Sequence, residues 1–242
     1  EQEKQLDPKV SVPELIRRAR ELGSLGEHDP IDRSTVWRAC KRLGLPLNRP
    51  SRRRDRDMRR FAYPQRMLMV LADGKHFRAG APRLKRVALS FIDDATRYIL
   101  GGGVGTTEST ELFLTGLHQV ILDYGLMLAL FIDNAGAFIS DDTRTVAARL
   151  GIHLIHGTAA YPEGHGKIER WNRTLWDQLL RTFDRNPEID PDLSALTLRL
   201  NHWMRYRYNH TPHEALKGKT PAQRWAEDTR ELVYPERADV PA

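Results

Sequence analysis

The sequence predicts an α/β protein in which a mixed β-sheet is flanked by helices and preceded by a small all-helical domain. Three observations lead to this prediction. Between residues 62 and 185, short apolar runs alternate with helical patterns, in the order three strands, helix, strand, helix, strand and helix. Such alternation is typical of a sheet with helices on both faces. Residues 8–44 show helical patterns only, and residues 190–230 are again helical.

The first three strands are predicted from apolar runs that end at turn residues. Residues 67–72 form such a run and end at Asp73. Residues 87–92 form the next, and the turn 93–96 leads into the extended segment 97–100. Three glycines follow that segment, and the sequence therefore favours an antiparallel meander at the start of the sheet.

The second half of the sheet region alternates between helix and strand. A helix capped by Thr107 or Ser109 has an apolar face at helical spacing and ends at Gly125. The apolar run 128–132 predicts a buried strand that ends at Asp133. The remaining elements are a helix, a short strand and a long helix, expected over residues 141–150, 152–155 and 167–183.

The N-terminal region shows the pattern of a helix-turn-helix. Residues 12–21 have helical spacing, and Ser34 is predicted to cap a second, basic helix over residues 35–43. Two helices joined by a glycine-containing turn favour a DNA-binding unit, although a generic helical hairpin is the alternative. In the first case, the side chains expected to reach DNA are Ser34, Thr35, Arg38 and Arg42.

The charge of the chain also favours a polyanionic partner. The formal net charge is +6, which is a weak indication of nucleic-acid binding by itself. Seven arginines, among them Arg52, Arg53 and Arg54, crowd residues 46–61 together with two prolines. This stretch is either a solvated linker or a basic strap that follows DNA phosphates, and we favour the strap because of the regions on either side.

Cysteine usage and hydropathy exclude several classes of protein. Cys40 is the only cysteine of the sequence, so a disulfide within the chain and a cysteine-rich zinc finger are excluded. No apolar run approaches the roughly 18 residues that a membrane span needs, and the first residues show no signal peptide. We therefore expect no membrane partner and a cytoplasmic location. The chain begins with Glu1 rather than methionine, and we expect it to be a fragment or a trimmed chain.

Two acidic residues stand where phosphodiester chemistry needs them. Asp133 follows a buried strand and opens an Asp-Asn turn, and open α/β sheets build sites at the carboxyl ends of strands. Glu169 lies in the first turn of the long helix, after a glycine-rich loop that contains His165 and Lys167. A loop of this kind can approach a phosphate closely. Each residue also has a structural explanation that involves no catalysis. Asp133 could simply initiate a turn, and Glu169 could be favoured in a first helical turn by the helix dipole.

These segments resemble a known family. Residues 131–138 and 162–171 resemble the second and third acidic blocks of the DDE transposases, which share a catalytic core with retroviral integrases. Residues 134–168, thirty-five in number, separate the two acids, an interval similar to that of the family. Residues 208–216 and 220–225 resemble the downstream part of bacterial insertion-sequence transposases.

The resemblance implies a ribonuclease-H-like fold and a division into domains. We expect a helix-turn-helix domain over residues 1–45 and an arginine-rich linker over 46–61. A catalytic core would follow over 62–188, with a C-terminal helical extension of the core over 189–242.

The resemblance also implies which residue is the first acid of the triad. The family places it on the strand before the Asp93-Asp94 pair, which selects Asp73; Asp93 is the alternative. Asp93 and Asp94 resemble the hairpin-turn element of the family, where side chains cap a turn. The block around Asp73 departs from the family because the usual tryptophan is absent. Ala135 and Glu163 are further departures, and neither removes an acid.

The implied activity is metal-dependent cleavage of DNA ends followed by strand transfer. The resemblance implies that Asp73, Asp133 and Glu169 bind Mg²⁺, with Mn²⁺ as a substitute and two ions in total, and that His165 and Lys167 contact phosphate. The implied partner is double-stranded DNA, both element ends and target, bound by a homo-oligomer near the nucleoid of a bacterial cytoplasm. The alternatives are an inactive transposase-derived regulator, another nuclease of the same fold and a structural interaction module.

Overall fold

The computed structural model describes residues 2–47, 62–132, 138, 140–156 and 162–235, with the side chains of 162–165 outside the description. The chain forms two compact units, Glu1–Arg59 and Arg60–Ala242, which are described separately. The boundary between them falls within the predicted arginine-rich linker, and Arg52, Arg53 and Arg54 lie outside the described residues.

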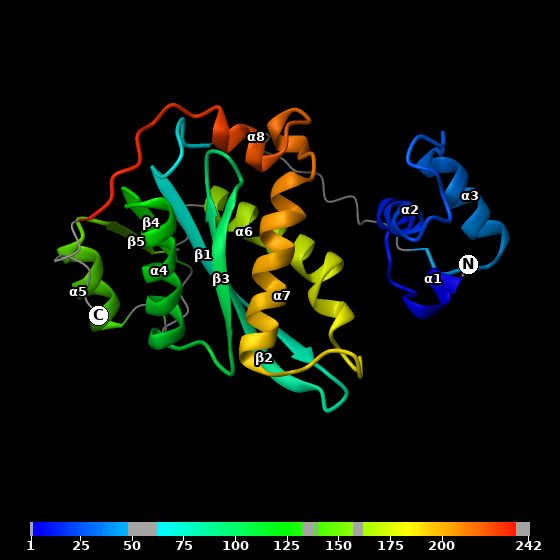
Figure 1. Ribbon diagram of the computed structural model, residues 1–242, viewed down its shortest axis with the longest axis horizontal. Helices are drawn as coiled ribbons and strands as arrows, with labels where there is room; N and C mark the ends of the chain where they lie inside the picture. Colours follow the sequence, from blue (N-terminus) through cyan, green and yellow to red (C-terminus); the bar gives the residue numbers. More distant parts are fainter. Residues whose placement is uncertain (1, 48–61, 133–137, 139, 157–161, 236–242) are drawn as a thin grey trace. The chain divides into compact units, whose positions relative to one another are not determined.

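The described part of the N-terminal unit contains three helices, which are α1 (Gln2–Leu6), α2 (Val12–Glu21) and α3 (Arg33–Arg42) (Figure 1). The side chain of Ser11 caps α2, as serine favours in this position. Asp32, and not Ser34, caps α3 by accepting a hydrogen bond from the Ser34 backbone N–H at 3.1 Å. The predicted cap was therefore wrong by two residues, because an aspartate directly before Arg33 offers a better acceptor for the first turn.

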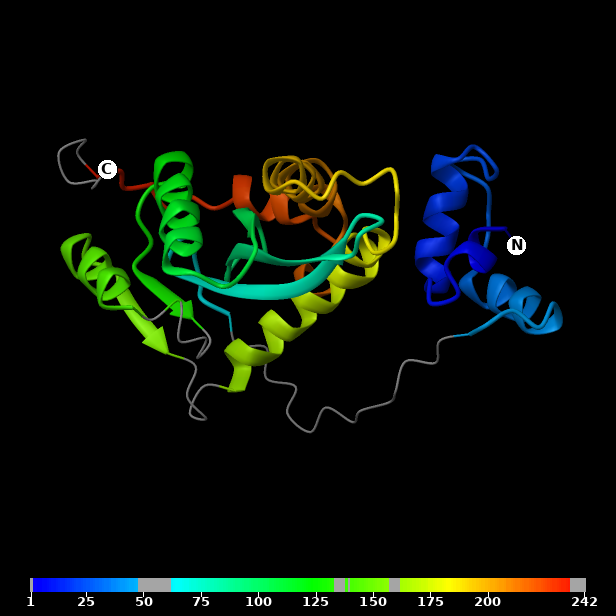
Figure 2. The ribbon, with the colours of Figure 1, turned by 90° about the horizontal axis from the view of Figure 1, so that it is seen from below.

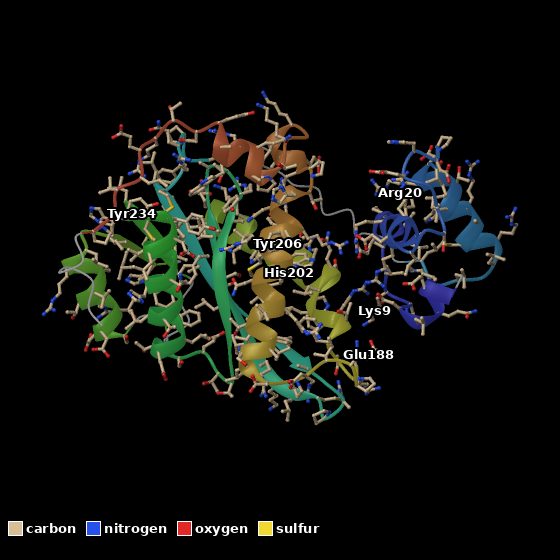
Figure 3. All side chains as sticks on the ribbon, in the orientation of Figure 1. Lys9, Arg20, Glu188, His202, Tyr206 and Tyr234 are labelled. Atoms are coloured by element: carbon tan, nitrogen blue, oxygen red, sulfur yellow. The ribbon has the colours of Figure 1, made fainter. Side chains whose placement is uncertain are left out.

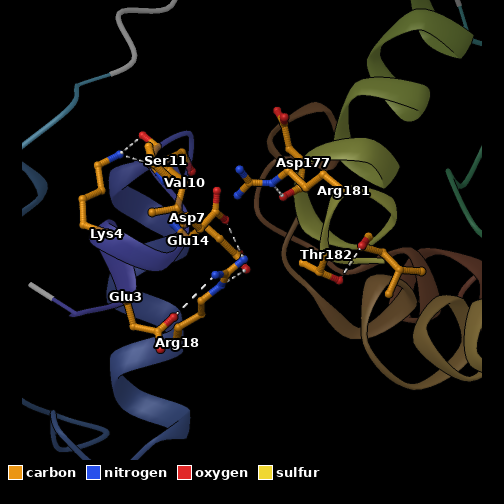
Figure 4. Close-up of polar contacts among 12 residues, drawn as sticks. Glu3, Lys4, Asp7, Val10, Ser11, Glu14, Arg18, Asp177, Arg181 and Thr182 are labelled. Carbon is orange, nitrogen blue, oxygen red and sulfur yellow. Dashed lines mark hydrogen bonds and ion pairs between the residues drawn. The ribbon is translucent and has the colours of Figure 1, made fainter. Parts of the chain in front are cut away.

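Polar contacts hold the first helices of this unit together. Lys4 is almost fully buried, and its ammonium donates to the carbonyls of Pro8 at 3.0 Å and Val10 at 2.6 Å. Arg18 forms ion pairs with Glu3, Asp7 and Glu14 at 3.2–3.5 Å (Figure 4). Val10 and Cys40 are the buried apolar side chains among the described residues of the unit, so these polar contacts supplement a small apolar core.

The larger unit is built on a five-stranded sheet in the order β3-β2-β1-β4-β5. The two antiparallel pairs are β1 with β2 and β2 with β3, and the two parallel pairs are β1 with β4 and β4 with β5. The predicted mixed sheet is confirmed. The strands are β1 (Met69–Ala79), β2 (Leu84–Asp93), β3 (Ile99–Gly105), β4 (Ala129–Ile132) and β5 (His153–His156).

Helices cover both faces of this sheet (Figures 1 and 2). One apolar cluster joins the sheet to α6 (Pro162–Gln178) and α7 (Leu193–Tyr206) through side chains such as Trp171 and Trp203. A second cluster joins the opposite face to α4 (Thr110–Tyr124) and α5 (Asp141–Arg149) through Phe113 and Ala147. Each face of β1 is therefore buried, which explains its nearly continuous apolar start.

The C-terminal residues complete the same unit. After the short 3₁₀ segments η2 (Leu180–Thr182), η3 (Tyr208–His210) and η4 (Glu214–Leu216) comes α8 (Pro221–Ala226). Pro221 opens α8, as proline favours at the first helical position, and Thr220 forms a capping box with Gln223. The chain then returns along α4, where the Tyr234 hydroxyl donates to the Asp123 carbonyl at 3.4 Å (Figure 3).

Two asparagines close the free edge of β3. Asn209 both accepts from the Ile99 N–H at 2.9 Å and donates to the Ile99 carbonyl at 3.0 Å. Asn201 makes the same pair of bonds to Gly102, at 3.1 and 2.9 Å. These side chains replace a neighbouring strand and protect the edge from pairing with another chain.

The strand β1 is longer than the sequence predicted. The apolar run suggested an end at Asp73, but β1 continues to Ala79 because β2 pairs with it from Val70 to Ala79. The parallel partner β4 pairs only from Met69 to Ala72. Asp73 therefore lies within a strand, at the point where the parallel pairing ends. None of the described helices is long and apolar enough to cross a membrane.

We expect Gly102→Ala to destabilise the larger unit by about 3 kcal/mol or more. A Cβ atom on Gly102 would lie 2.0 Å from the Leu89 carbonyl oxygen, and backbone cannot move aside cheaply. Gly166→Ala in α6 is the matched control, because its methyl group meets nothing within 4 Å. The control should gain up to about 1 kcal/mol. Urea unfolding followed by circular dichroism measures both, and equal stabilities would contradict the predicted close contact.

Candidate active site

Asp73 projects from the middle of the sheet. Its Cα atom lies opposite that of Ser90 in β2. One carboxylate oxygen accepts from the Gly74 N–H at 2.9 Å, and the other accepts from the Asn172 side-chain amide of α6 at 2.5 Å. The indole N–H of Trp171 donates to the Ser90 hydroxyl at 2.7 Å, so α6 is anchored to the sheet beside Asp73.

Glu169 reaches the same place from α6. This helix buries Ile168, Trp171 and Leu175 against the sheet. Because a helix has 3.6 residues per turn, residues 169, 172, 173 and 176 then share a different face. The Glu169 side chain is 64% exposed and accepts a hydrogen bond from Arg173 at 3.1 Å. The Glu169 carboxylate is therefore accessible to ligands, and its ion pair with Arg173 is itself exposed to solvent.

Asp73 and Glu169 line one open pocket. Its volume is about 480 Å³, and its lining residues are Asp73, Lys75, Ile168, Glu169, Asn172, Arg173 and Trp176. Residues almost a hundred positions apart in the chain are thereby brought together. The predicted first and third acids are neighbours in space, a closeness that no sequence pattern could show.

The second predicted acid, Asp133, lies outside the described residues. Its sequence neighbour Ile132 ends β4 and is the Cα partner of Ala72, which precedes Asp73. Within the described part of the chain, no group of three His, Cys, Asp or Glu side chains could hold a metal ion. Asp133 lies outside that part.

The surroundings of Asp93 indicate a structural role for this residue. It is fully buried, and it accepts hydrogen bonds from the Met67 N–H and from both the N–H and the hydroxyl of Thr96, at 2.6–2.8 Å. Burial raises the pKa of Asp93 to about 6, and the accepted hydrogen bonds act in the opposite direction. With both oxygens engaged in a turn, Asp93 does not line the pocket of Asp73 and Glu169.

Asp94 occupies the next position and connects three segments. It accepts from the Tyr63 N–H at 2.8 Å, pairs with Arg97 at 3.0 Å and forms an ion pair with Lys167 of α6. The Lys167 side chain is only 14% exposed. The structure therefore places Lys167 in a buried ion pair at the start of α6, while the side chain of His165 lies outside the described residues.

The predicted DNA-binding residues of α3 are accessible. Ser34, Thr35, Arg38 and Arg42 are all exposed. They recur at helical spacing, so the outer side of α3 combines two hydroxyls with two guanidinium groups. Arg38 also donates to the Ser34 carbonyl at 3.2 Å, which holds its side chain along the helix.

Besides the apolar Ile168, four pocket residues were not predicted from the sequence, namely Lys75, Asn172, Arg173 and Trp176. Their spacing in the sequence from Asp73 and Glu169 could have indicated that they lie beside these acids. Lys75 is two residues after Asp73 in a strand and so shares its side of the sheet. The other three follow Glu169 by three, four and seven residues and so share its helix face.

Solved structures with the same fold are those of retroviral integrases. The simian T-cell lymphotropic virus intasome, determined with PP2A regulatory subunit B56 gamma, matches with a TM-score of 0.56 and 18% identity over 91% of this chain and 77% of that chain. The catalytic core domain of BIV integrase matches with a TM-score of 0.50 and 21% identity over 66% of this chain and 95% of that chain. The predicted ribonuclease-H-like fold is confirmed, and the larger unit is an integrase-like core.

Sequence relatives are transposases and retroviral polyproteins. The transposase for insertion sequence IS1202 of Streptococcus pneumoniae is 27% identical over 195 residues, which are 75% of this chain and 39% of the relative. The transposase for transposon Tn552 of Staphylococcus aureus is 28% identical over 152 residues, 55% of this chain and 31% of the relative. The Gag-Pol polyprotein of woolly monkey sarcoma virus is 26% identical over 137 residues. No family model matches the chain.

The chain spans less than two fifths of the length of these relatives. The predicted kinship with transposases and integrases is nevertheless confirmed, since fold and sequence point to one class. The chain contains a transposase/integrase-like core.

We expect Asp93→Asn to destabilise the protein by about 2–3 kcal/mol. The amide that replaces the carboxylate would point its NH₂ group at another hydrogen-bond donor. That donor is either the Met67 N–H or the N–H and hydroxyl of Thr96. Asp177→Asn on the exposed side of α6 is the matched control and should change stability by less than about 0.5 kcal/mol. The measurement is urea unfolding. A fully stable Asp93→Asn variant that loses DNA cleavage would instead assign catalysis to Asp93.

Proposed function

We propose that this chain catalyses metal-dependent cleavage of DNA ends and strand transfer, as a DDE-type transposase. One observation carries the proposal: Asp73 and Glu169 line the same pocket, beside the strand pair in which Ile132 lies opposite Ala72. The residues that follow this pair in the sequence are Asp133 and Asp73. Two adjacent parallel strands therefore lead into two carboxylates, and α6 supplies the third.

The pocket fits a hard divalent cation. Carboxylate oxygens are the ligands that Mg²⁺ and Mn²⁺ prefer in proteins. The side-chain oxygen of Asn172 is buried beside Asp73 and has no hydrogen-bond partner among the described residues, so a further oxygen is available there. In this proposal Asp73, Asp133 and Glu169 would hold two ions. Bound metal would activate the attacking oxygen and stabilise the leaving oxygen of a phosphodiester.

The protein's own residues position the acids. Asn172 donates to one Asp73 oxygen and so fixes the rotation of that carboxylate. The buried side of α6 holds Glu169 on a rigid helix, which favours a constant geometry. Because three carboxylates repel one another, cation binding would also relieve their mutual repulsion. Water and then a DNA 3′-hydroxyl would be the successive nucleophiles, with no covalent protein intermediate.

DNA binding is proposed for both units. In the N-terminal unit, the exposed side of α3 would reach DNA through Ser34, Thr35, Arg38 and Arg42. Arg52, Arg53 and Arg54 would follow phosphates in the linker, and His165 would contact phosphate near the acids. The sequence also predicted a phosphate contact for Lys167, but its ammonium is engaged by Asp94. Double-stranded element ends and target DNA would be bound by an oligomer in the bacterial cytoplasm, near the nucleoid. Both described acids are retained in the pocket, which favours an active enzyme over a regulator.

We expect Asp73→Asn, Asp133→Asn and Glu169→Gln each to lower cleavage and strand transfer by at least about a thousandfold. Each substitution removes a charged oxygen ligand and nearly keeps the shape of the side chain. The assay uses labelled DNA of the element ends with Mg²⁺ or Mn²⁺, and chelation of the metal should abolish activity in the wild type. Each variant is checked for folding and DNA binding. If a folded Asp73→Asn variant keeps cutting, the assignment of the first acid is wrong.

We expect the double variant Arg38→Gln, Arg42→Gln to weaken DNA binding without unfolding α3. Each lost phosphate contact should reduce the slope of log affinity against log salt by about 0.9. Arg20→Gln, on α2 of the same unit, is the matched control (Figure 3). Fluorescence anisotropy over a salt series measures the slopes. Equal slopes for the double variant and the wild type would exclude α3 as a phosphate-binding helix.

A further inference from the structure

The pocket extends well beyond the acids. Trp176 is seven residues after Glu169 on α6, which corresponds to roughly 10 Å along the helix axis. Both residues line the pocket, and so does Lys75 of β1. The side of the pocket away from the start of α6 therefore combines a cation with an aromatic ring. Neither residue belongs to the proposed metal-binding triad.

Lys75 is the pocket cation that has no partner among the described residues. Two carboxylates and two cations line the pocket, and Arg173 is already paired with Glu169. Lys75 is half-buried and makes no hydrogen bond or ion pair with any residue that the structure describes. An ammonium that lines a pocket without a protein partner can pair with a negatively charged ligand. Its position next to Asp73 on the same side of β1 makes a phosphate the matching group.

Trp176 supplies a surface of different chemistry. Its ring packs against the apolar cluster under α6 and stays half-buried, so one part of the ring remains in the pocket. An aromatic ring beside a cationic side chain is the combination by which proteins bind single-stranded nucleic acid. The cation binds the backbone and the ring stacks on a base. Stacking of this kind tolerates any base because every base has a π-face.

We propose that Lys75 and Trp176 form a nucleotide subsite, in which Lys75 binds a backbone phosphate and Trp176 stacks on the adjacent unpaired base. This inference rests on the proposed function and deepens it, because it names the part of the DNA that this side of the pocket holds. The nucleotide flanks the phosphate that reacts at the acids. Lys75 also offsets the negative charge of Asp73 and Glu169, which would otherwise repel incoming DNA.

The test measures binding of the full chain to a short fluorescent oligothymidylate in Ca²⁺. Two chemically altered probes accompany it: one with uncharged methylphosphonate linkages and one with abasic sugars. Lys75→Gln should lower affinity for the normal probe about five- to tenfold and reduce the salt slope by about 0.7, the value for one single-strand phosphate. It should have no effect on the methylphosphonate probe. Trp176→Ala should lower affinity about tenfold for the normal probe and leave binding of the abasic probe unchanged.

The controls separate this subsite from the DNA contacts elsewhere in the chain. Lys85→Gln, an exposed lysine of the neighbouring strand β2, should bind all probes like the wild type. Trp176→Phe keeps a ring and should restore most of the affinity, which excludes a folding defect as the cause. For each variant, the difference in binding free energy between the normal and the altered probe is compared with that of the wild type. Contributions from contacts made by other residues cancel in this comparison.

Each outcome tests either the nucleotide subsite or the proposed catalysis. If each substitution weakens binding of the normal and altered probes equally, or weakens neither, the subsite is wrong, even where the wild type cuts DNA. If the loss of affinity is confined to the normal probe but the wild type cuts no DNA with Mg²⁺ or Mn²⁺, the subsite stands and the proposed catalysis fails. Where cleavage is seen, Lys75→Gln should raise KM about five- to tenfold and leave kcat within about twofold, because it removes binding shared by ground and transition states.

Discussion

The double pairing of β1 is the constraint on which the rest of the core depends. This strand pairs in parallel with β4 over its first four residues and in antiparallel fashion with β2 over almost all of its length. The parallel partner ends at Ile132, whereas β1 continues. Asp73 is therefore the first residue of β1 without a parallel neighbour among the described residues, in the centre of the sheet and on the side of α6. A shift of one residue in this register would turn Asp73 to the opposite face.

The second requirement is that α6 lie across this point in one orientation. Its apolar face, with Ile168, Trp171 and Leu175, fixes the rotation of the helix against the sheet. The bond from Trp171 to Ser90 and the ion pair of Lys167 with Asp94 fix its position along the sheet. Glu169 and Asn172 then reach the pocket without further adjustment. The buried polar groups around Asp94 thus serve the site indirectly, by holding the helix that carries it.

The sequence could predict the elements better than their ends. Periodicity identified each strand and helix of the core, because buried faces require regular apolar spacing. It missed the extension of β1 to Ala79, since the polar residues there are stabilised by pairing with β2 and not by burial. It also misplaced the cap of α3, because two neighbouring residues, Asp32 and Ser34, are both good caps. The asparagine clamps on β3 were invisible, since Asn201 and Asn209 act on residues about a hundred positions away.

For the site, the sequence alone determined the chemistry of the candidates. The order and spacing of Asp73, Asp133 and Glu169, together with the surrounding motifs, indicated a transposase-like core, and fold and relatives agree with this. Only the tertiary structure decided that Asp73 and Glu169 line one pocket, that Asp93 is engaged in a buried turn, and that Lys75, Asn172 and Trp176 belong beside the acids. The physical reason is that residue type and spacing fix what a side chain can do and which face it occupies. Which faces meet depends on the pairing and packing of distant segments.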